Sequence, residues 1–215
     1  MKARVAVVTV DGKTYFLVVN ELKRRGIPFT SLIPGESIPA QTKAAITTCD
    51  EKKHIIHSKI LVYDSTTDPE ALGREIVKIL SGKENYESIL IGIDPGEVFG
   101  LAAIADGQVI DSENCSSLQK TLSKIEGIIK NVDEARTGLT VKIGSGVPVY
   151  RKLLHVLDEK LPLWVSLEIV EEAGTNGHAK EGRNRRGFRH IISATLIARR
   201  SGFVYHRRKI VETNP

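Results

Sequence analysis

The stretch SILIGIDPGEVFGLAAIADGQ, residues 88–108, decides how we interpret the rest of the chain. An apolar run ends at Asp94-Pro95-Gly96, a second one begins at Gly100, and Asp106-Gly107 turns the chain back toward a third. Short apolar runs separated by tight Gly and Pro turns are typical of antiparallel strands. The stretch therefore predicts a three-stranded meander whose third strand runs from Gln108 to about Cys115.

Asp94 is the unusual residue of this meander. It ends a run, Ile91-Gly92-Ile93, that looks buried on both faces of a sheet. A carboxylate in such a place needs a compensating partner, and a divalent cation is one candidate. An ordinary Asp-Pro-Gly turn at the end of a strand is the other interpretation.

Helical and strand patterns alternate after the meander. Apolar residues at helical spacing predict three helices, at residues 117–130, 149–161 and about 188–200. Two further apolar runs predict strands, at residues 139–143 and 163–170. The predicted element order is therefore three strands, helix, strand, helix, strand, helix (βββαβαβα).

This order, with Gly92-Ile93-Asp94-Pro95-Gly96 and the following Gly100, resembles the RNase H-like superfamily. The likeness is greatest to its RuvC and YqgF branch of resolvases and nucleases, and it covers residues 88–202. It implies an α/β fold with a mixed sheet in residues 87–215. It also implies a metal-dependent nuclease that acts on structured or branched nucleic acid with Mg²⁺ or Mn²⁺.

Two-metal phosphodiester hydrolysis needs carboxylates from separate elements that converge on the cations. The resemblance makes Asp94 the first ligand. The text VEEAGTN from Val170 resembles the YqgF segment that carries the catalytic Glu, which assigns that role to Glu172. Glu168 competes for it, because residues four apart on a strand face the same side.

The third ligand departs from the family pattern. Both branches place an Asp on the last helix, where this chain offers His190 or Ser193, and no Asp or Glu occurs in residues 182–211. Imidazole is a ligand for Mn²⁺ and can act as a general base, so His190 can take the third place. Alternatively, His190 is a hydrogen-bonded residue of the helix face that packs on the sheet.

Positive charge is concentrated at the end of the chain. Residues 173–215 contain ten Lys or Arg and two Glu, within a whole-chain net charge of +5. A basic segment next to candidate metal ligands predicts contacts with the phosphates of DNA or RNA. The residues expected to make these contacts are Lys180, Arg183, Arg185, Arg186 and Arg189.

Residues 1–86 predict a separate, small α/β domain. Strands are expected at residues 3–10, 28–33, 43–49 and 59–63, with helices at residues 14–25 and 70–80. Asp11-Gly12-Lys13-Thr14 invites comparison with a phosphate-binding loop, but the upstream glycine of that motif is absent. We interpret these four residues as a tight turn before a helix.

The sequence is also compatible with other functions. The same fold could bind nucleic acid or a protein partner without cleaving it, which the missing third acid favours. A sugar-kinase or actin-like phosphotransferase would need a second lobe that residues 1–86 do not supply. A resolvase of branched DNA would also act as a homodimer. Without an apolar run of membrane-spanning length, and with two well-separated cysteines, we expect a cytoplasmic protein with reduced thiols.

Overall fold

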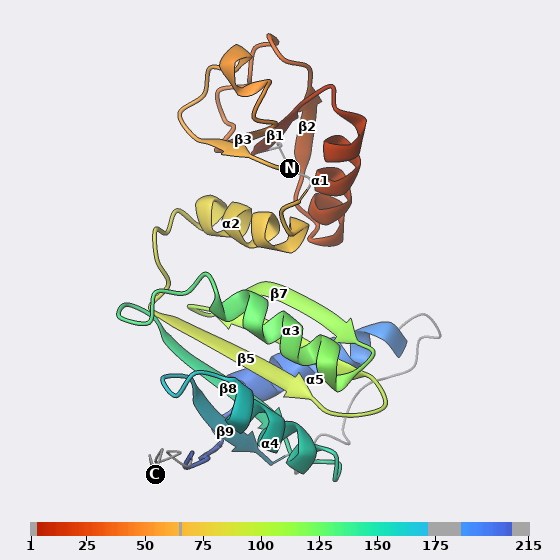
Figure 1. Cartoon of the computed structure of the whole chain (residues 1–215), viewed down its shortest axis with the longest axis vertical. Coiled ribbons are helices and arrows are strands. Elements are labelled where there is room, and N and C mark those ends of the chain that lie inside the picture. Colours follow the sequence, from red (N-terminus) through yellow and green to blue (C-terminus); the bar gives the residue numbers. More distant parts are fainter. Residues whose placement is uncertain (1–3, 65, 172–185, 208–215) are drawn as a thin grey trace, which may run out of the picture. The chain divides into compact units, whose positions relative to one another are not determined.

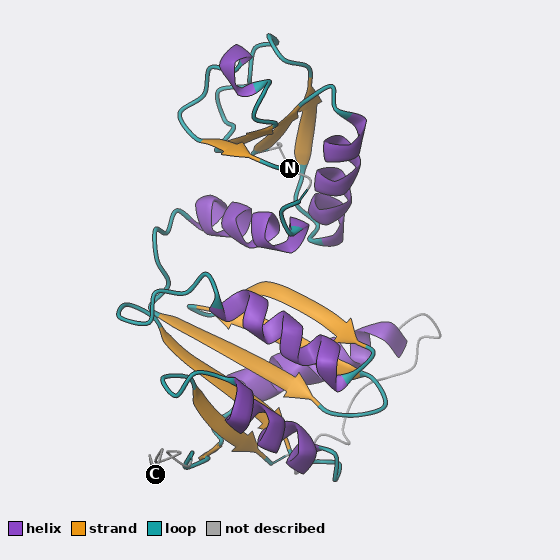
Figure 2. Ribbon diagram, in the orientation of Figure 1, coloured by secondary structure: helices purple, strands orange, loops and turns teal. Residues whose placement is uncertain are grey.

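The structure is a computed structural model that describes residues 4–64, 66–171 and 186–207, with only the backbone of Arg186 and Gly187. The chain divides into two compact units, residues 1–84 and 85–215, which we call unit 1 and unit 2. Both units are α/β, and their elements are shown in Figures 1 and 2. The predicted boundary at residues 86 and 87 lies within three residues of this division.

Unit 1 contains a four-stranded parallel sheet with the strand order β2-β1-β3-β4. Its elements are β1 (Val5–Val8), α1 (Gly12–Arg24), β2 (Phe29–Leu32), β3 (Ala44–Thr47), a 3₁₀ turn (Lys52–His54), β4 (Ile60–Val62) and α2 (Pro69–Ser81). The four predicted strands and two predicted helices are thus present. The strands are shorter than expected, because apolar residues continue into the turns that follow them.

The helix ends of unit 1 follow from local side-chain chemistry. The Asp11 carboxylate accepts a hydrogen bond from the Thr14 backbone N–H at 2.7 Å, so the turn before α1 is an N-cap. Asp68 caps α2 in the same way, with Pro69 in the first turn. Gly82 ends α2 in the left-handed conformation, with φ of 74°.

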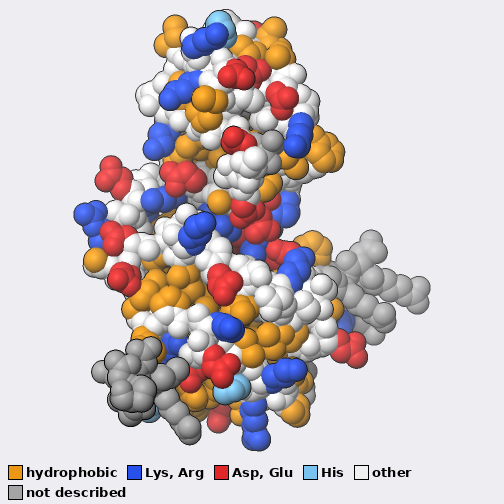
Figure 3. Space-filling view, in the orientation of Figure 1, with side chains coloured by type: hydrophobic (Ala, Val, Ile, Leu, Met, Phe, Trp, Pro, Cys, Tyr) orange, Lys and Arg blue, Asp and Glu red, His pale blue; other side chains and the backbone are white. Residues whose placement is uncertain are grey.

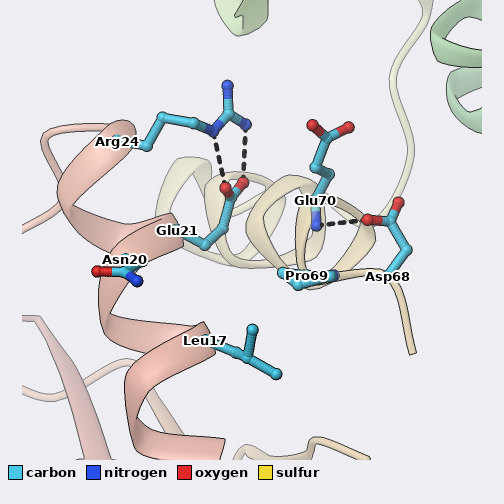
Figure 4. Close-up of a pocket in the computed structure, with 7 residues that line it drawn as sticks. All are labelled: Leu17, Asn20, Glu21, Arg24, Asp68, Pro69 and Glu70. Atoms are coloured by element: carbon cyan, nitrogen blue, oxygen red, sulfur yellow. Dashed lines mark hydrogen bonds and ion pairs between the residues drawn. The ribbon is translucent and has the colours of Figure 1, made fainter. Parts of the chain in front are cut away.

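The two faces of the unit 1 sheet are covered differently. Val7 and Ile46 pack with α1 and α2 residues such as Leu22 and Ile76. The opposite face, which includes Val8, packs mainly against loop residues. Side chains of α1 and α2 also line an open pocket of about 360 Å³, where Glu21 is paired with Arg24 (Figure 4).

Unit 2 contains a six-stranded mixed sheet with the strand order β10-β9-β8-β5-β6-β7. Its elements are β5 (Ser88–Asp94), β6 (Phe99–Ala105), β7 (Gln108–Cys115), α3 (Leu118–Ile129), β8 (Gly138–Gly144), α4 (Tyr150–Lys160), β9 (Ser166–Val170), α5 (Arg186–Arg199) and β10 (Phe203–Val204). The meander β5-β6-β7 is antiparallel, and β8 and β9 continue from β5 in parallel.

The predicted order βββαβαβα is observed up to α5, and β10 is an addition. A strand of two residues is too short to show an alternating pattern, so the sequence did not reveal it. The predicted strand at residues 163–170 begins only at Ser166, because Val165 closes a turn with Pro162. The third strand of the meander has the predicted bounds.

Helix α5 covers one face of the unit 2 sheet, and α3 and α4 cover the other (Figure 2). Two glycines let α5 approach β5 and β6 closely. A Cβ atom on Gly92 would lie 2.0 Å from the Ala194 carbonyl oxygen, and one on Gly100 would lie 2.1 Å from that of His190. The adjacent Ile91 and Ile93 are fully buried, and alternation places them toward the opposite face.

Candidate functional site

The candidate site lies where β5 ends beneath the first half of α5. Asp94 is the last residue of β5 and pairs in register with Gly100 of β6. Because Gly100 has no side chain, the backbone of His190 passes directly over β6 at this point. The imidazole then reaches the carboxylate, with 3.1 Å between His190 Nδ1 and Asp94 Oδ2.

The Asp94–His190 pair is partly open to solvent. The side chain of Asp94 is 15% exposed and that of His190 is 39% exposed. Burial raises the pKa of Asp94, and hydrogen bonds from His190 and Ser193 offset this only in part. The site therefore holds a carboxylate whose negative charge is incompletely compensated by its neighbours. A cation bound beside Asp94 would favour the charged form.

Glu168 is held by a different partner. Its carboxylate lies 2.9 Å from Lys142 Nζ, and this ammonium also donates to the Arg200 carbonyl at 2.8 Å. In the sheet register, Glu168 aligns with Lys142 and Gly92, two residues before Asp94 along β5. The structure thus pairs the partly exposed Glu168, which lies two strands away from the strand that ends in Asp94, with the buried Lys142.

The remaining predicted site residues divide into two groups. Arg189 is exposed on α5, and Arg186 is the first residue of that helix. Glu172, Lys180, Arg183 and Arg185 lie outside the described residues. The roles expected of them, Glu172 as a metal ligand and the three basic residues as phosphate contacts, therefore stay predictions.

Asp94 and His190 lie close enough to contact one metal ion, with 3.1 Å between Nδ1 and Oδ2. Among the residues that the structure describes, no group of three His, Cys, Asp or Glu could hold a metal ion. One carboxylate and one imidazole suit Mn²⁺ better than Mg²⁺, which prefers oxygen ligands. A third ligand would have to come from outside the described ranges, where Glu172 lies.

Sequence reasoning missed Lys142, although a signal was present. Lys142 interrupts the apolar run of β8 and is only 7% exposed. A lysine is rarely this buried unless it is paired, so its position in LTVKIG predicted an acidic partner on a neighbouring strand. That partner is Glu168, whose register position was not evident from the sequence.

Comparisons with known proteins bear mainly on unit 1. A family model described as a response regulator receiver-like domain matches residues 4–80, which is less than half of the chain. No curated protein matches. The Argonaute of Marinitoga piezophila, solved by crystallography with a 5′-OH guide RNA and target DNA, is a similar structure with 11% identity and a TM-score of 0.25. That match covers 79% of this chain and 39% of the Argonaute chain.

Two further findings concern the cysteines and the lengths of the helices. Both Cys49 and Cys115 have free thiols. In the ranges that the structure describes, no helix has both the length and the apolar character needed to cross a membrane.

Proposed function

We propose that unit 2 is an RNase H-like domain and acts as a metal-dependent nuclease on structured or branched nucleic acid. The observation that carries this proposal is the contact of 3.1 Å between Asp94 at the end of β5 and His190 on α5. The order of elements in unit 2 and its mixed sheet support the proposed fold.

In this proposal Asp94 and His190 hold a divalent cation together with Glu172. Such a cation would supply Lewis-acid activation of water and of the phosphodiester. Asp94 supplies the oxygen ligand, and its burial keeps it in one orientation. The contact of 3.1 Å with His190 Nδ1 positions the carboxylate further.

The basic residues of the segment 173–189 would bind the nucleic-acid backbone. Arg189 is one residue from His190 and is exposed, so its guanidinium can contact phosphate beside the site. A contact of this kind carries no base preference, which agrees with a substrate chosen by its shape.

A second candidate is an RNase H-like protein that binds nucleic acid or a protein partner without cleaving it. The Lys142–Glu168 ion pair favours this function, because it withdraws one of the candidate carboxylates from metal binding. The hydrogen bond between Asp94 and His190 favours it as well, since a metal ion would have to displace it.

Hydrolysis of labelled single strands, duplexes and four-way junctions, as DNA and as RNA, separates the two functions. We expect cleavage by the wild type with Mn²⁺ exceeding that with Mg²⁺, and its loss in Asp94→Asn. Glu126→Gln, a matched change of an exposed carboxylate on α3, should cleave like the wild type. Binding without cleavage by every protein in either metal would exclude the nuclease and leave the second candidate.

A further inference from the structure

Helix α5 crosses three strands of the unit 2 sheet and meets a particular residue on each. The backbone of His190 passes over Gly100 of β6, and the middle of the helix passes over Gly92 of β5. Just beyond the helix, the Arg200 carbonyl accepts a hydrogen bond from Lys142 Nζ of β8 at 2.8 Å. The candidate site thus lies at one end of α5, and Lys142 holds the other end.

The glycine contacts and the Lys142 contact restrain α5 in different ways. The glycines set how closely the helix approaches the sheet, through van der Waals contact with its backbone. A hydrogen bond is directional and needs its donor and acceptor within about 3.2 Å of each other. The bond from Lys142 to the Arg200 carbonyl therefore also restrains the position of α5 along its own axis.

Lys142 is itself held in one place. Its side chain is 9% exposed, and its ammonium lies 2.9 Å from the carboxylate of Glu168 on the neighbouring strand β9. Strand register aligns Lys142 with Gly92, so both residues face α5. A buried ammonium is costly unless it is paired and hydrogen-bonded. Moving the Arg200 carbonyl away would leave this charge with one partner fewer.

The helix carries this restraint to the candidate site. Arg200 closes the last turn of α5, because its backbone N–H donates to the carbonyls of Leu196 and Ile197 at 3.1 and 3.2 Å. From His190 to Arg200, a helix with a rise of 1.5 Å per residue spans about 15 Å. A continuous helix of this length shifts as one body along its axis. A shift of about half an ångström would take the 3.1 Å contact between His190 and Asp94 out of hydrogen-bonding range.

We propose that Lys142 is a positioning residue for the Asp94–His190 site. It holds the end of α5 and thereby sets the distance between the imidazole and the carboxylate, so it acts through the helix and not on the reacting atoms. Its part in catalysis rests on the proposed function, which needs both side chains on one cation. Its effect on the geometry does not, and can be measured without metal or substrate.

The first readout is the ¹⁵N NMR shift of His190 Nδ1 in the full-length protein, without metal and at a single pH. The wild type and Asp94→Ala give the two end values, with and without the carboxylate. Lys142→Met removes the donor to Arg200 and leaves a Glu168 side chain that is 20% exposed and can be solvated. We expect the His190 signal of Lys142→Met to move at least halfway toward that of Asp94→Ala.

A second variant and a matched control keep this readout specific. Lys142→Met with Glu168→Gln removes both charges of the pair, leaves neither without its partner, and should show the same displacement even if the single variant does not fold. Lys124→Met with Asp111→Asn removes another buried lysine and its carboxylate, 3.2 Å apart, between α3 and β7. This control should keep the wild-type His190 signal. A wild-type signal in the folded Lys142 variants, or an equal displacement in the control, would overturn the proposal.

The second readout is cleavage of nucleic acid with Mn²⁺. Lys142→Met should lower kcat by roughly tenfold or more while KM changes by less than about twofold, because a displaced ligand weakens transition-state stabilisation more than substrate binding. An unchanged kcat beside a displaced His190 signal would overturn the part of Lys142 in the reaction. A wild type that does not cleave would exclude the proposed nuclease, and the NMR result would still decide whether Lys142 positions His190.

Discussion

Gly92 and Gly100 set how closely α5 approaches the sheet of unit 2. Atoms of the α5 backbone occupy the places where their Cβ atoms would be. Backbone cannot move aside as the end of a flexible side chain can. The Asp94–His190 contact therefore depends on two residues that carry no functional group.

We predict that Gly92→Ala destabilises unit 2 by about 2 to 4 kcal/mol, because a Cβ atom 2.0 Å from the Ala194 carbonyl oxygen must displace α5. Urea denaturation measures this change. Gly138→Ala in β8 is the control, since its nearest contact would be an ordinary 3.8 Å to Glu87. Equal stability of the two variants would mean that α5 does not pack as described.

The raised pKa of Asp94 leads to a second prediction at the level of a single residue. Its ordinary value is 3.8, and burial raises it in the folded state despite the hydrogen bonds of His190 and Ser193. The folded protein therefore binds this proton more tightly than the unfolded chain does. Ionisation of Asp94 therefore lowers the free energy of unfolding. This loss grows as the pH rises through 3.8 and is complete above the folded pKa.

Asp94→Asn removes this cost. The stability of the variant relative to the wild type should thus increase between about pH 4 and pH 7. Denaturant unfolding across that range measures the difference, and Glu126→Gln, on the exposed side of α3, should show no such trend. A difference that stays constant with pH would contradict the raised pKa.

At the level of elements, the end of α4 depends on Arg207, which is distant in sequence. Its guanidinium donates to the carbonyls of Asp158 and Leu161, at 2.6 and 2.7 Å, and pairs with the Asp158 carboxylate at 2.9 Å. The last carbonyls of a helix have no partner within it. Arg207 supplies those partners and so attaches the chain after β10 to α4.

Arg207→Gln should cost about 2 to 4 kcal/mol in the free energy of unfolding, because several partly buried carbonyls and one carboxylate lose a donor at once. Amide hydrogen exchange should also show faster opening of the last turn of α4. Arg151→Gln, an exposed arginine on the same helix, is the control and should change stability by less than about 0.5 kcal/mol. Similar effects of both substitutions would rule out a specific anchor.

The charge of the whole molecule is unevenly distributed. The face shown in Figure 3 mixes acidic and basic side chains over both units. The sequence places ten of the 31 Lys and Arg residues in the last 43 positions. Under the proposed function, the binding of nucleic acid should therefore depend on a small part of the chain.

We predict that the affinity for nucleic acid falls steeply with salt. The slope of log K against log salt should decrease by about one for each phosphate-contacting residue lost, so Arg185→Gln with Arg189→Gln should lower it by about two. Lys52→Gln with Lys53→Gln removes the same charge from an exposed turn of unit 1 and should leave the slope unchanged. Equal slopes for the two double variants would show that the basic segment is not the binding surface.

Much of the architecture follows from local patterns that can be read without a structure. The bounds of β7 and the tight turn before α1 were evident, because turns and periodicity act over a few residues. The two-residue β10 was missed, since its existence depends only on pairing with β9.

The candidate site, too, combines features that the sequence predicts with features that only the structure shows. The sequence by itself indicated that Asp94 ends a buried strand and that positive charge gathers at the end of the chain, and the resemblance to the RNase H-like superfamily put His190 or Ser193 in the place of an acid. Only the tertiary structure decided that His190 reaches Asp94 and that Glu168 is held by Lys142. The reason is physical: an apolar or basic pattern is local, whereas the partner of a buried charge depends on strand register and on how closely a helix can approach a glycine.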